Sequence, residues 1–161
     1  NSGATFTVEL PLTAQTKLTM PSSPPLASIE AKTLRGKRIL AVDDEQDALE
    51  LMRFVLSENG AEVVCANSAK KALQELENNE FDLLISDLGM PEMDGYDLIG
   101  EIRRSKKDHH QTLPAIALTG YVSADDRERV LSAGFQIHRS KPIVIDHLSA
   151  TAQKLSQNGD F

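Results

Sequence analysis

The chain reads FDLLISDLGMPEMDG from Phe81 to Gly95, so that an apolar run ends in a carboxylate and a turn follows at once. Short, nearly continuous apolar runs are typical of strands that are buried on both faces, as in a parallel sheet. Gly89 and Pro91 predict the turn. Asp87 therefore stands at the exit of a predicted buried strand, which is where ligand sites form in parallel α/β sheets.

Similar apolar runs alternate with amphipathic segments of helical length from Lys37 onward. Strands are predicted at residues 38–42, 62–66, 81–86, 115–118 and 135–138, and helices at 46–59, 69–78, 96–106, 124–133 and 146–157. Gly60 and Gly134 stand where left-handed helix ends belong, and Ser68 and Ser123 where N-caps belong. The pattern predicts an α/β fold with a five-stranded, doubly wound parallel sheet.

Polar residues also follow two other predicted strands. Asp43 and Asp44 come directly after residues 38–42, and Thr119 comes directly after residues 115–118. Because parallel strands end at the same edge of a sheet, we expect these side chains to share a pocket with Asp87. The carboxylates alone would repel one another, and hard oxygen ligands without His or Cys favour Mg2+ as the cation that relieves the repulsion.

A carboxylate in such a pocket can attack phosphorus and become an acyl phosphate. Lys141 follows the last predicted strand, and its ammonium group and the Thr119 hydroxyl can meet the charge that develops on phosphoryl oxygens. Asp43 and Asp44 could instead be only an acidic helix start, Thr119 a capping hydroxyl and Lys141 a surface charge. The shared register of these residues with Asp87 favours the phosphoryl site.

The composition excludes several other classes of protein. With 161 residues, the chain has room for one main domain. A net charge of -7, with the basic residues dispersed, argues against nucleic-acid binding. Cys65 is the single cysteine, which excludes an internal disulfide and fits a reducing cytosol. No apolar run is long enough to cross a bilayer, and we expect a cytoplasmic location. Because the chain begins at Asn1 rather than at Met, we expect it to be a piece of a larger protein, which can carry a membrane anchor elsewhere.

Four motifs together resemble the receiver domain of two-component response regulators: Val42-Asp43-Asp44-Glu45, the stretch from Asp87 to Gly95, Thr119-Gly120 and Ser140-Lys141-Pro142. The resemblance implies a flavodoxin-like (βα)5 fold in which Asp87 accepts phosphate from a phosphohistidine. It further implies that Asp43 and Asp44 hold Mg2+ together with Asp87 and the backbone carbonyl of Gly89. Thr119 and Lys141 would bind the phosphoryl group. The receiver domain is expected to cover residues 37–158.

The segment before the receiver carries a second resemblance. Residues 1–12 contain an alternating run, from Ala4 to Leu12, that is similar to the closing strand of a histidine-kinase ATP-binding domain, and the Pro-rich residues 13–36 read as a linker. A hybrid histidine kinase has this order of parts. The residues that bind ATP would lie before Asn1, so this chain is expected to catalyse only its own phosphotransfer and dephosphorylation. The implied partners are the kinase core and a His-containing phosphotransfer protein or downstream regulator.

Two histidine positions stand apart from the motifs. His138 occupies the place in the last strand where the family usually carries Tyr or Phe, whose rotation follows the movement of the Thr119 position. It is therefore either a titratable replacement in the switch or a partly exposed residue on the interaction face. His109 and His110 lie in a polar stretch before Pro114, and we predict that both are solvated loop residues.

The sequence thus predicts a Mg2+-dependent phosphoacceptor domain of a phosphorelay, which passes the phosphoryl group on or signals by a change of conformation at Thr119. Two alternatives remain. One is a receiver that is never phosphorylated and acts only by docking. The other is a Mg2+-dependent phosphohydrolase with an aspartyl-phosphate intermediate, which would be expected to carry a second acid where Gly89 stands.

Overall fold

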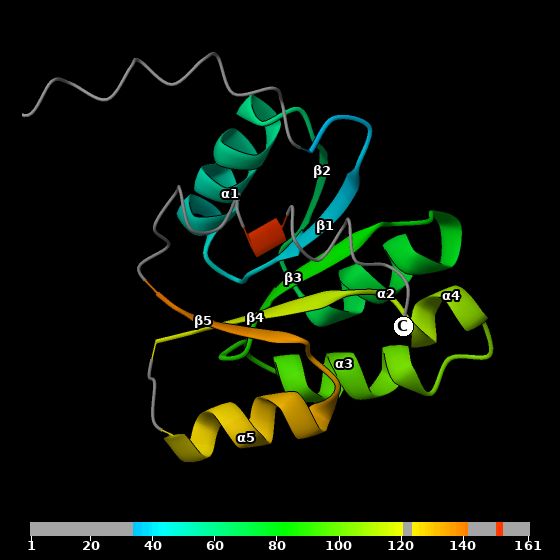
Figure 1. Cartoon of the computed structure of the whole chain (residues 1–161), viewed down its shortest axis with the longest axis vertical. Coiled ribbons are helices and arrows are strands. Elements are labelled where there is room, and N and C mark those ends of the chain that lie inside the picture. The colour runs from blue at the N-terminus through cyan, green and yellow to red at the C-terminus, as the bar shows by residue number, and fades with distance from the viewer. Residues whose placement is uncertain (1–33, 121–123, 142–150, 153–161) are drawn as a thin grey trace, which may run out of the picture. The chain divides into compact units, whose positions relative to one another are not determined.

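Five parallel strands form one sheet in the order β2-β1-β3-β4-β5 (Figure 1). The structure is a computed structural model that describes residues 34–120, 124–141 and 151–152. The strands are β1 (Arg38–Val42), β2 (Glu62–Ala66), β3 (Leu83–Asp87), β4 (Ala115–Thr119) and β5 (Ile137–Ser140). The helices are α1 (Gln46–Glu58), α2 (Ala69–Asn78), α3 (Gly95–Arg103), α4 (Asp108–Gln111) and α5 (Ala124–Ala133). The predicted fold class and parallel sheet are confirmed.

The strand order places the exits of β1 and β3 side by side. The chain runs from β1 to β2 on one side and then crosses back, so that β3 pairs with the opposite edge of β1, with Val42 opposite Ser86. Such a reversal opens a crevice at the carboxyl ends of the two strands. Asp43 directly follows β1 and Asp87 is the last residue of β3, so both carboxylates arise at this crevice.

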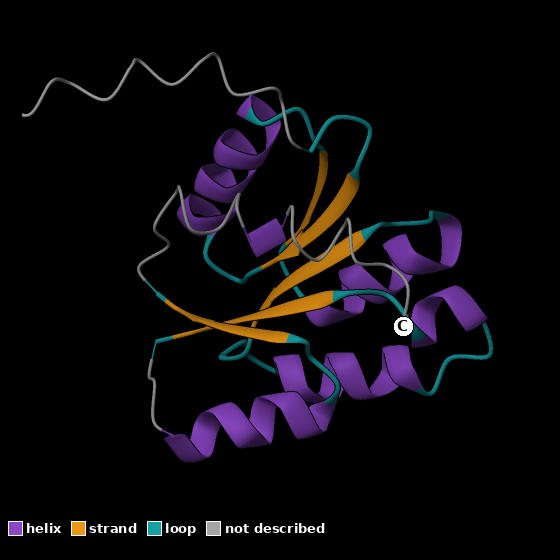
Figure 2. Ribbon diagram, in the orientation of Figure 1, coloured by secondary structure: helices purple, strands orange, loops and turns teal. Residues whose placement is uncertain are grey.

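Helices cover both faces of the sheet, as the apolar strands require (Figures 1 and 2). Leu49 and Met52 of α1 pack on one face, in a cluster that also contains Ile85 of β3. Helices α2, α3 and α5 cover the other face, where Leu84 of β3 and Ile102 of α3 belong to a second cluster. Strand β3 is buried at all of its positions, which confirms the prediction made from its sequence.

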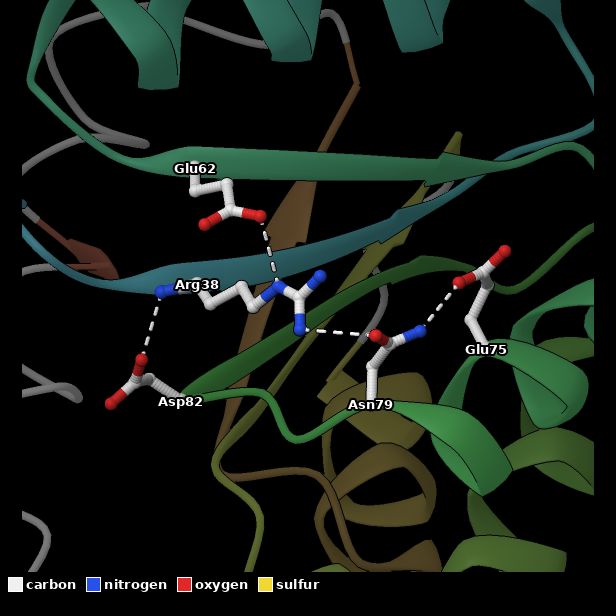
Figure 3. A network of polar contacts seen from close by, with 5 residues as sticks. All are labelled: Arg38, Glu62, Glu75, Asn79 and Asp82. Carbon is white, nitrogen blue, oxygen red and sulfur yellow. Dashed lines mark hydrogen bonds and ion pairs between the residues drawn. The ribbon is translucent and has the colours of Figure 1, made fainter.

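The edge of the sheet where the strands begin is held by polar contacts, shown in Figure 3. The Arg38 side chain donates to Glu62 Oε1 and to Asn79 Oδ1, each at 3.1 Å, and its backbone N–H donates to Asp82 Oδ2 at 2.8 Å. Asn79 in turn donates to Glu75 Oε2 at 3.0 Å. One arginine thus ties the start of β1 to β2, to the end of α2 and to the residue before β3.

Several predicted boundaries differ from the structure. Strand β5 begins at Ile137 rather than at Phe135, whose ring is instead buried in the core just before the strand. Helix α4 was not predicted, and it buries His110, so the prediction that this histidine is solvated was wrong. The segment 1–33, Ser123 and the predicted last helix lie outside the described residues, except that residues 151–152 are helical. Leu34 is buried, so the core begins before Lys37.

Arg103, the last residue of α3, joins three separate segments near the same end of the domain. Its guanidinium makes four hydrogen bonds to three carbonyl oxygens: His110 at 2.9 Å, Leu113 at 2.7 Å, and Gly134 at 2.8 and 3.2 Å. Burial lowers the pKa of Arg103, since no carboxylate among the described residues pairs with it. The planar guanidinium therefore forms hydrogen bonds to main-chain carbonyl oxygens rather than an ion pair with a carboxylate.

We expect Arg103→Lys to lower the free energy of unfolding by about 2 kcal/mol, because an ammonium cannot reach all three carbonyls at once. Urea denaturation followed by circular dichroism measures this change. The matched control is Arg104→Lys. The side chain of Arg104 is 71% exposed, and within the described residues it pairs only with Glu101 and the Gly100 carbonyl of its own helix. The control should stay within about 0.5 kcal/mol of the wild type. Equal losses in the two variants would contradict the proposed role of the Arg103 guanidinium.

Candidate functional site

Three carboxylates meet at the crevice between the exits of β1 and β3. Asp43, Asp44 and Asp87 each offer an oxygen, and these oxygens lie within 4.8 Å of one another. Asp43 is fully buried and Asp87 is 5% exposed, whereas Asp44 is exposed. The structure therefore brings together the three acids that the sequence predicted, with one of them open to solvent.

Lys141 bridges the two buried acids. Its Nζ lies 2.8 Å from Asp43 Oδ2 and 2.9 Å from Asp87 Oδ1, and its backbone N–H donates to the Thr119 carbonyl at 2.7 Å. Burial lowers the pKa of Lys141, but the hydrogen bonds and charges of Asp43 and Asp87 outweigh it, so that the pKa lies above its usual value of 10.5. The ammonium is therefore fully charged at neutral pH.

The remaining oxygens of the two buried acids are held by the backbone. Asp43 Oδ1 accepts a hydrogen bond from the Glu45 N–H at 3.0 Å, and Asp87 Oδ2 accepts one from the Gly89 N–H at 2.8 Å. Each of the two carboxylates thus has one oxygen hydrogen-bonded to a nearby backbone N–H and the other paired with the Lys141 ammonium. This arrangement fixes the orientation of both groups before any ligand arrives.

The charges at this site do not balance. Among the described residues, three carboxylates face one ammonium, which leaves two negative charges at one edge of the sheet. A donor set of carboxylate oxygens without His or Cys suits a hard divalent cation such as Mg2+, and the exposed Asp44 leaves it a side from which to enter. The residues present therefore fit a divalent metal ion.

The two other predicted residues lie on the last two strands. Thr119 ends β4, is partly buried and stands opposite Ser140, so the structure places it at the same edge as the carboxylates. His138 stands opposite Ala117, two positions farther from that edge. The His138 side chain is partly buried, and its Nε2 has no hydrogen-bond partner within the described parts of the chain. The structure does not bring His138 into contact with the acids.

The loop after β3 and the first residue of α3 contain two features that the sequence analysis missed. Glu92 has a positive φ of 65°, and the Met93 N–H donates to the Pro91 carbonyl at 2.8 Å, which forms a tight three-residue turn. Gly95 lies against the backbone of the phosphoacceptor candidate, since a Cβ there would overlap the Asp87 carbonyl oxygen and come within 2.9 Å of Leu88 Cα. A glycine directly after an N-cap aspartate was the only sign of this contact in the sequence.

Acidic residues from β1 and β3 and a lysine after β5, gathered at one edge of a sheet of this strand order, define a receiver-type signalling domain. Residues 39–153 match the family described as the response regulator receiver domain. The chain belongs to this family.

Three proteins illustrate the similarity. The chain is 47% identical, over 70% of its own length and 84% of the relative's, to an uncharacterized 14.6 kDa protein of the sodA1 3' region of Leptolyngbya boryana. It is 32% identical to the sensor protein EvgS of Escherichia coli (strain K12), over 96% of this chain and 12% of EvgS. The signal receiver domain of a signal transduction histidine kinase from Syntrophus aciditrophicus superposes with a TM-score of 0.68 at 30% identity, covering 75% of this chain and 90% of that one.

The chain spans only a small part of the sensor kinases it matches, 12% in the case of a GacS protein of Pseudomonas protegens. It is homologous to the receiver portions of such hybrid kinases. None of the helices in the described ranges has the length and apolar character that a membrane span needs.

Proposed function

We propose that this domain accepts a phosphoryl group on Asp87 in a Mg2+-dependent reaction and serves a two-component phosphorelay. The observation that carries the proposal is the position of Lys141, which holds one oxygen each of Asp43 and Asp87 at 2.8 and 2.9 Å. A buried carboxylate with a fixed orientation and an adjacent cation is suited to nucleophilic attack on phosphorus. Membership of the receiver family supports this role.

In the proposed step a carboxylate oxygen of Asp87 attacks the phosphorus of a phosphohistidine. A bond forms between oxygen and phosphorus, while the bond between phosphorus and the imidazole nitrogen breaks and that nitrogen keeps the electron pair. The Lys141 ammonium then shifts part of its interaction from the carboxylate to the new phosphoryl oxygens, and the Thr119 hydroxyl donates to another of them. Asp43, Asp44, Asp87 and the carbonyl of Gly89 would hold Mg2+, which neutralises charge on the phosphoryl oxygens.

The domain is proposed to be the receiver part of a hybrid histidine kinase. The EvgS match covers 96% of the chain and thus reaches well into the residues before Leu34. This extent supports the interpretation of residues 1–12 as the end of a kinase ATP-binding domain and of residues 13–36 as a linker. The phosphoryl donor would then be the kinase core of the same protein on the cytoplasmic side, and the acceptor a His-containing phosphotransfer protein or a downstream regulator.

The proposal is tested by incubating the chain with acetyl phosphate, with Mg2+ or with EDTA, and by measuring its intact mass. One phosphoryl group should be added only when Mg2+ is present. Borohydride reduction and peptide mapping should locate the group at Asp87. If neither acetyl phosphate nor the parent kinase labels the chain, a docking role without phosphorylation is favoured instead.

Replacing Asp44 by Asn should weaken Mg2+ binding about 100-fold, because it removes the exposed carboxylate of the cluster. Isothermal titration calorimetry with MgCl2 measures the affinity, and labelling at a low Mg2+ concentration should fall in parallel. The matched control is Asp47→Asn, which removes an exposed acid from the first turn of α1, outside the cluster. Equal Mg2+ affinity of Asp44→Asn and wild type would show that the metal is not held by Asp44.

A further inference from the structure

A second pocket lies between α2, α3 and α4, at the end of the domain where the strands begin. Its volume is about 460 Å3. Its apolar side is formed by Leu76 and Ile102, which are 2% and 1% exposed. Pockets of this size with an apolar wall and a few polar groups are typical of small-molecule sites. Neither the carboxylate cluster nor Lys141 takes part in it.

His110 is the buried polar group of this pocket, at 5% exposure. Its Nδ1 lies 3.0 Å from Ser105 Oγ, and that oxygen already accepts a hydrogen bond from the Lys107 N–H at 3.2 Å. The Ser105 hydroxyl can donate to Nδ1, and in that tautomer the imidazole proton lies on Nε2. Nε2 is buried, and no described group meets the geometry of a hydrogen bond to it; the nearby Leu76 carbonyl favours the protonated ring without forming a well-aligned bond. A buried N–H donor without an acceptor is costly, and a ligand oxygen would satisfy it.

Three cationic side chains line the pocket, those of Arg104, Lys106 and Lys107, against two carboxylates, those of Glu77 and Glu101, so the excess charge favours an anion. Lys107 Nζ is occupied by the Glu77 carbonyl at 2.8 Å, and Arg104 by Glu101 at 2.7 Å. Lys106, by contrast, lines the pocket, is exposed and makes no side-chain contact of this kind in the part of the chain that the structure describes. Its ammonium is therefore available to a negatively charged ligand in a protein whose net charge is otherwise -7.

We propose that this pocket binds a small organic carboxylate, with its apolar body against Leu76 and Ile102. One carboxylate oxygen accepts the Nε2–H of His110, and the Lys106 ammonium balances the charge. The site is separate from the phosphorylation site, and the proposal does not depend on it.

The electrostatic surroundings of His110 agree with a neutral donor. Burial lowers the pKa of His110 below its usual value of 6.5, and the charges of His109 and Lys107 lower it further. The Leu76 carbonyl and the charge of Glu80 raise the pKa of His110, but the net shift is still downward. An anion bound at Nε2 would favour the imidazolium, so binding should raise the pKa of His110.

Benzoate is the probe, and the His110 ring nitrogens are observed by long-range 1H–15N NMR of the full chain. Benzoate should shift the Nε2 resonance of His110 and raise its pKa. Lys106→Gln should weaken benzoate binding about fivefold without altering the fold. His110→Gln should abolish binding, whereas His109→Gln, which changes an exposed neighbour, should leave it intact. Inorganic phosphate serves as a second probe and reports whether an oxyanion binds without the apolar body.

The proposal is overturned if saturating benzoate leaves the His110 ring unchanged, or if Lys106→Gln binds benzoate as tightly as wild type. It is also overturned if inorganic phosphate shifts the His110 ring as strongly as benzoate does, because the apolar wall would then contribute nothing. Should His110→Gln fail to fold, the Lys106→Gln affinity and the pKa shift of His110 in the wild type decide the question. Benzoate binding should be the same in Asp87→Asn.

Discussion

Asp87→Asn is expected to abolish labelling by acetyl phosphate. An amide is a far weaker nucleophile than a carboxylate and cannot form the acyl phosphate. The substitution keeps the shape of the side chain, so the loss should not reflect a change of fold. Because it also removes one of three clustered negative charges, the variant should be at least as stable as wild type when no divalent metal is present. Intact-mass spectrometry measures the labelling, and thermal unfolding in EDTA measures the stability.

The matched control for this variant is Asp94→Asn. Asp94 is an acid in the same loop, where its Oδ1 accepts the Asp97 N–H at 2.8 Å as the N-cap of α3. Asparagine caps helices as well as aspartate does, so this variant should fold and be labelled like wild type. Labelling that persists in Asp87→Asn would show that another residue is phosphorylated. Loss of labelling in both variants would point to a disturbed loop instead.

Gly95→Ala is expected to reduce the free energy of unfolding by about 3 kcal/mol and to impair phosphorylation of the folded fraction. The added methyl group would overlap the Asp87 carbonyl oxygen and approach Leu88 Cα to 2.9 Å. Both obstacles are backbone atoms that cannot turn away as a side chain could. Relief of the clash must displace either the start of α3 or the end of β3, which carries Asp87. Urea denaturation and the rate of labelling by acetyl phosphate measure the two effects.

The control for this change is Gly100→Ala in the middle of the same helix. A Cβ at Gly100 would meet only the flexible end of Arg104, at 3.5 Å. Alanine is the better helix former, so this variant should gain about 0.5–1 kcal/mol. Destabilisation of both variants to the same degree would mean that α3 tolerates no added methyl group at either position. It would contradict a particular role for the contact of Gly95 with the backbone of Asp87 and Leu88.

The fold was predictable because the strands carry a strong apolar signal, and this holds even for the edge strand β2. Residues 38–42 and 62–66 were predicted with the bounds that the structure gives. The predicted bounds of β5 lay two residues too early. Its last two positions, Arg139 and Ser140, are exposed on an edge strand and carry no apolar signal, while Phe135 is apolar and buried although it precedes the strand. Helix α4 escaped prediction because four polar residues carry no apolar periodicity.

The acids and their meeting at one edge of the sheet were predictable from their places at strand exits, but the contacts that Lys141 makes with them were not. Asp43 and Asp87 were expected to meet, whereas the bridge that Lys141 makes to both depends on how β5 ends beside β4. The sequence contained no sign of the role of Arg103, since its carbonyl partners are distant in sequence or belong to helix α4, which was not predicted. Only the assembled structure places these groups at bonding distance.

The two ends of the sheet differ mechanically. Where the strands begin, Arg38 and Arg103 fasten several segments to one another through fixed hydrogen bonds. Where they end, mutually repelling carboxylates are held by the Lys141 ammonium and by the backbone N–H groups of Glu45 and Gly89. A change of charge at Asp87 therefore acts at the end of the sheet that depends on charge interactions, and it leaves the hydrogen bonds of Arg38 and Arg103 unaltered. We expect any displacement on phosphorylation to concentrate in the loops around the carboxylates, with the opposite end of the sheet keeping its contacts.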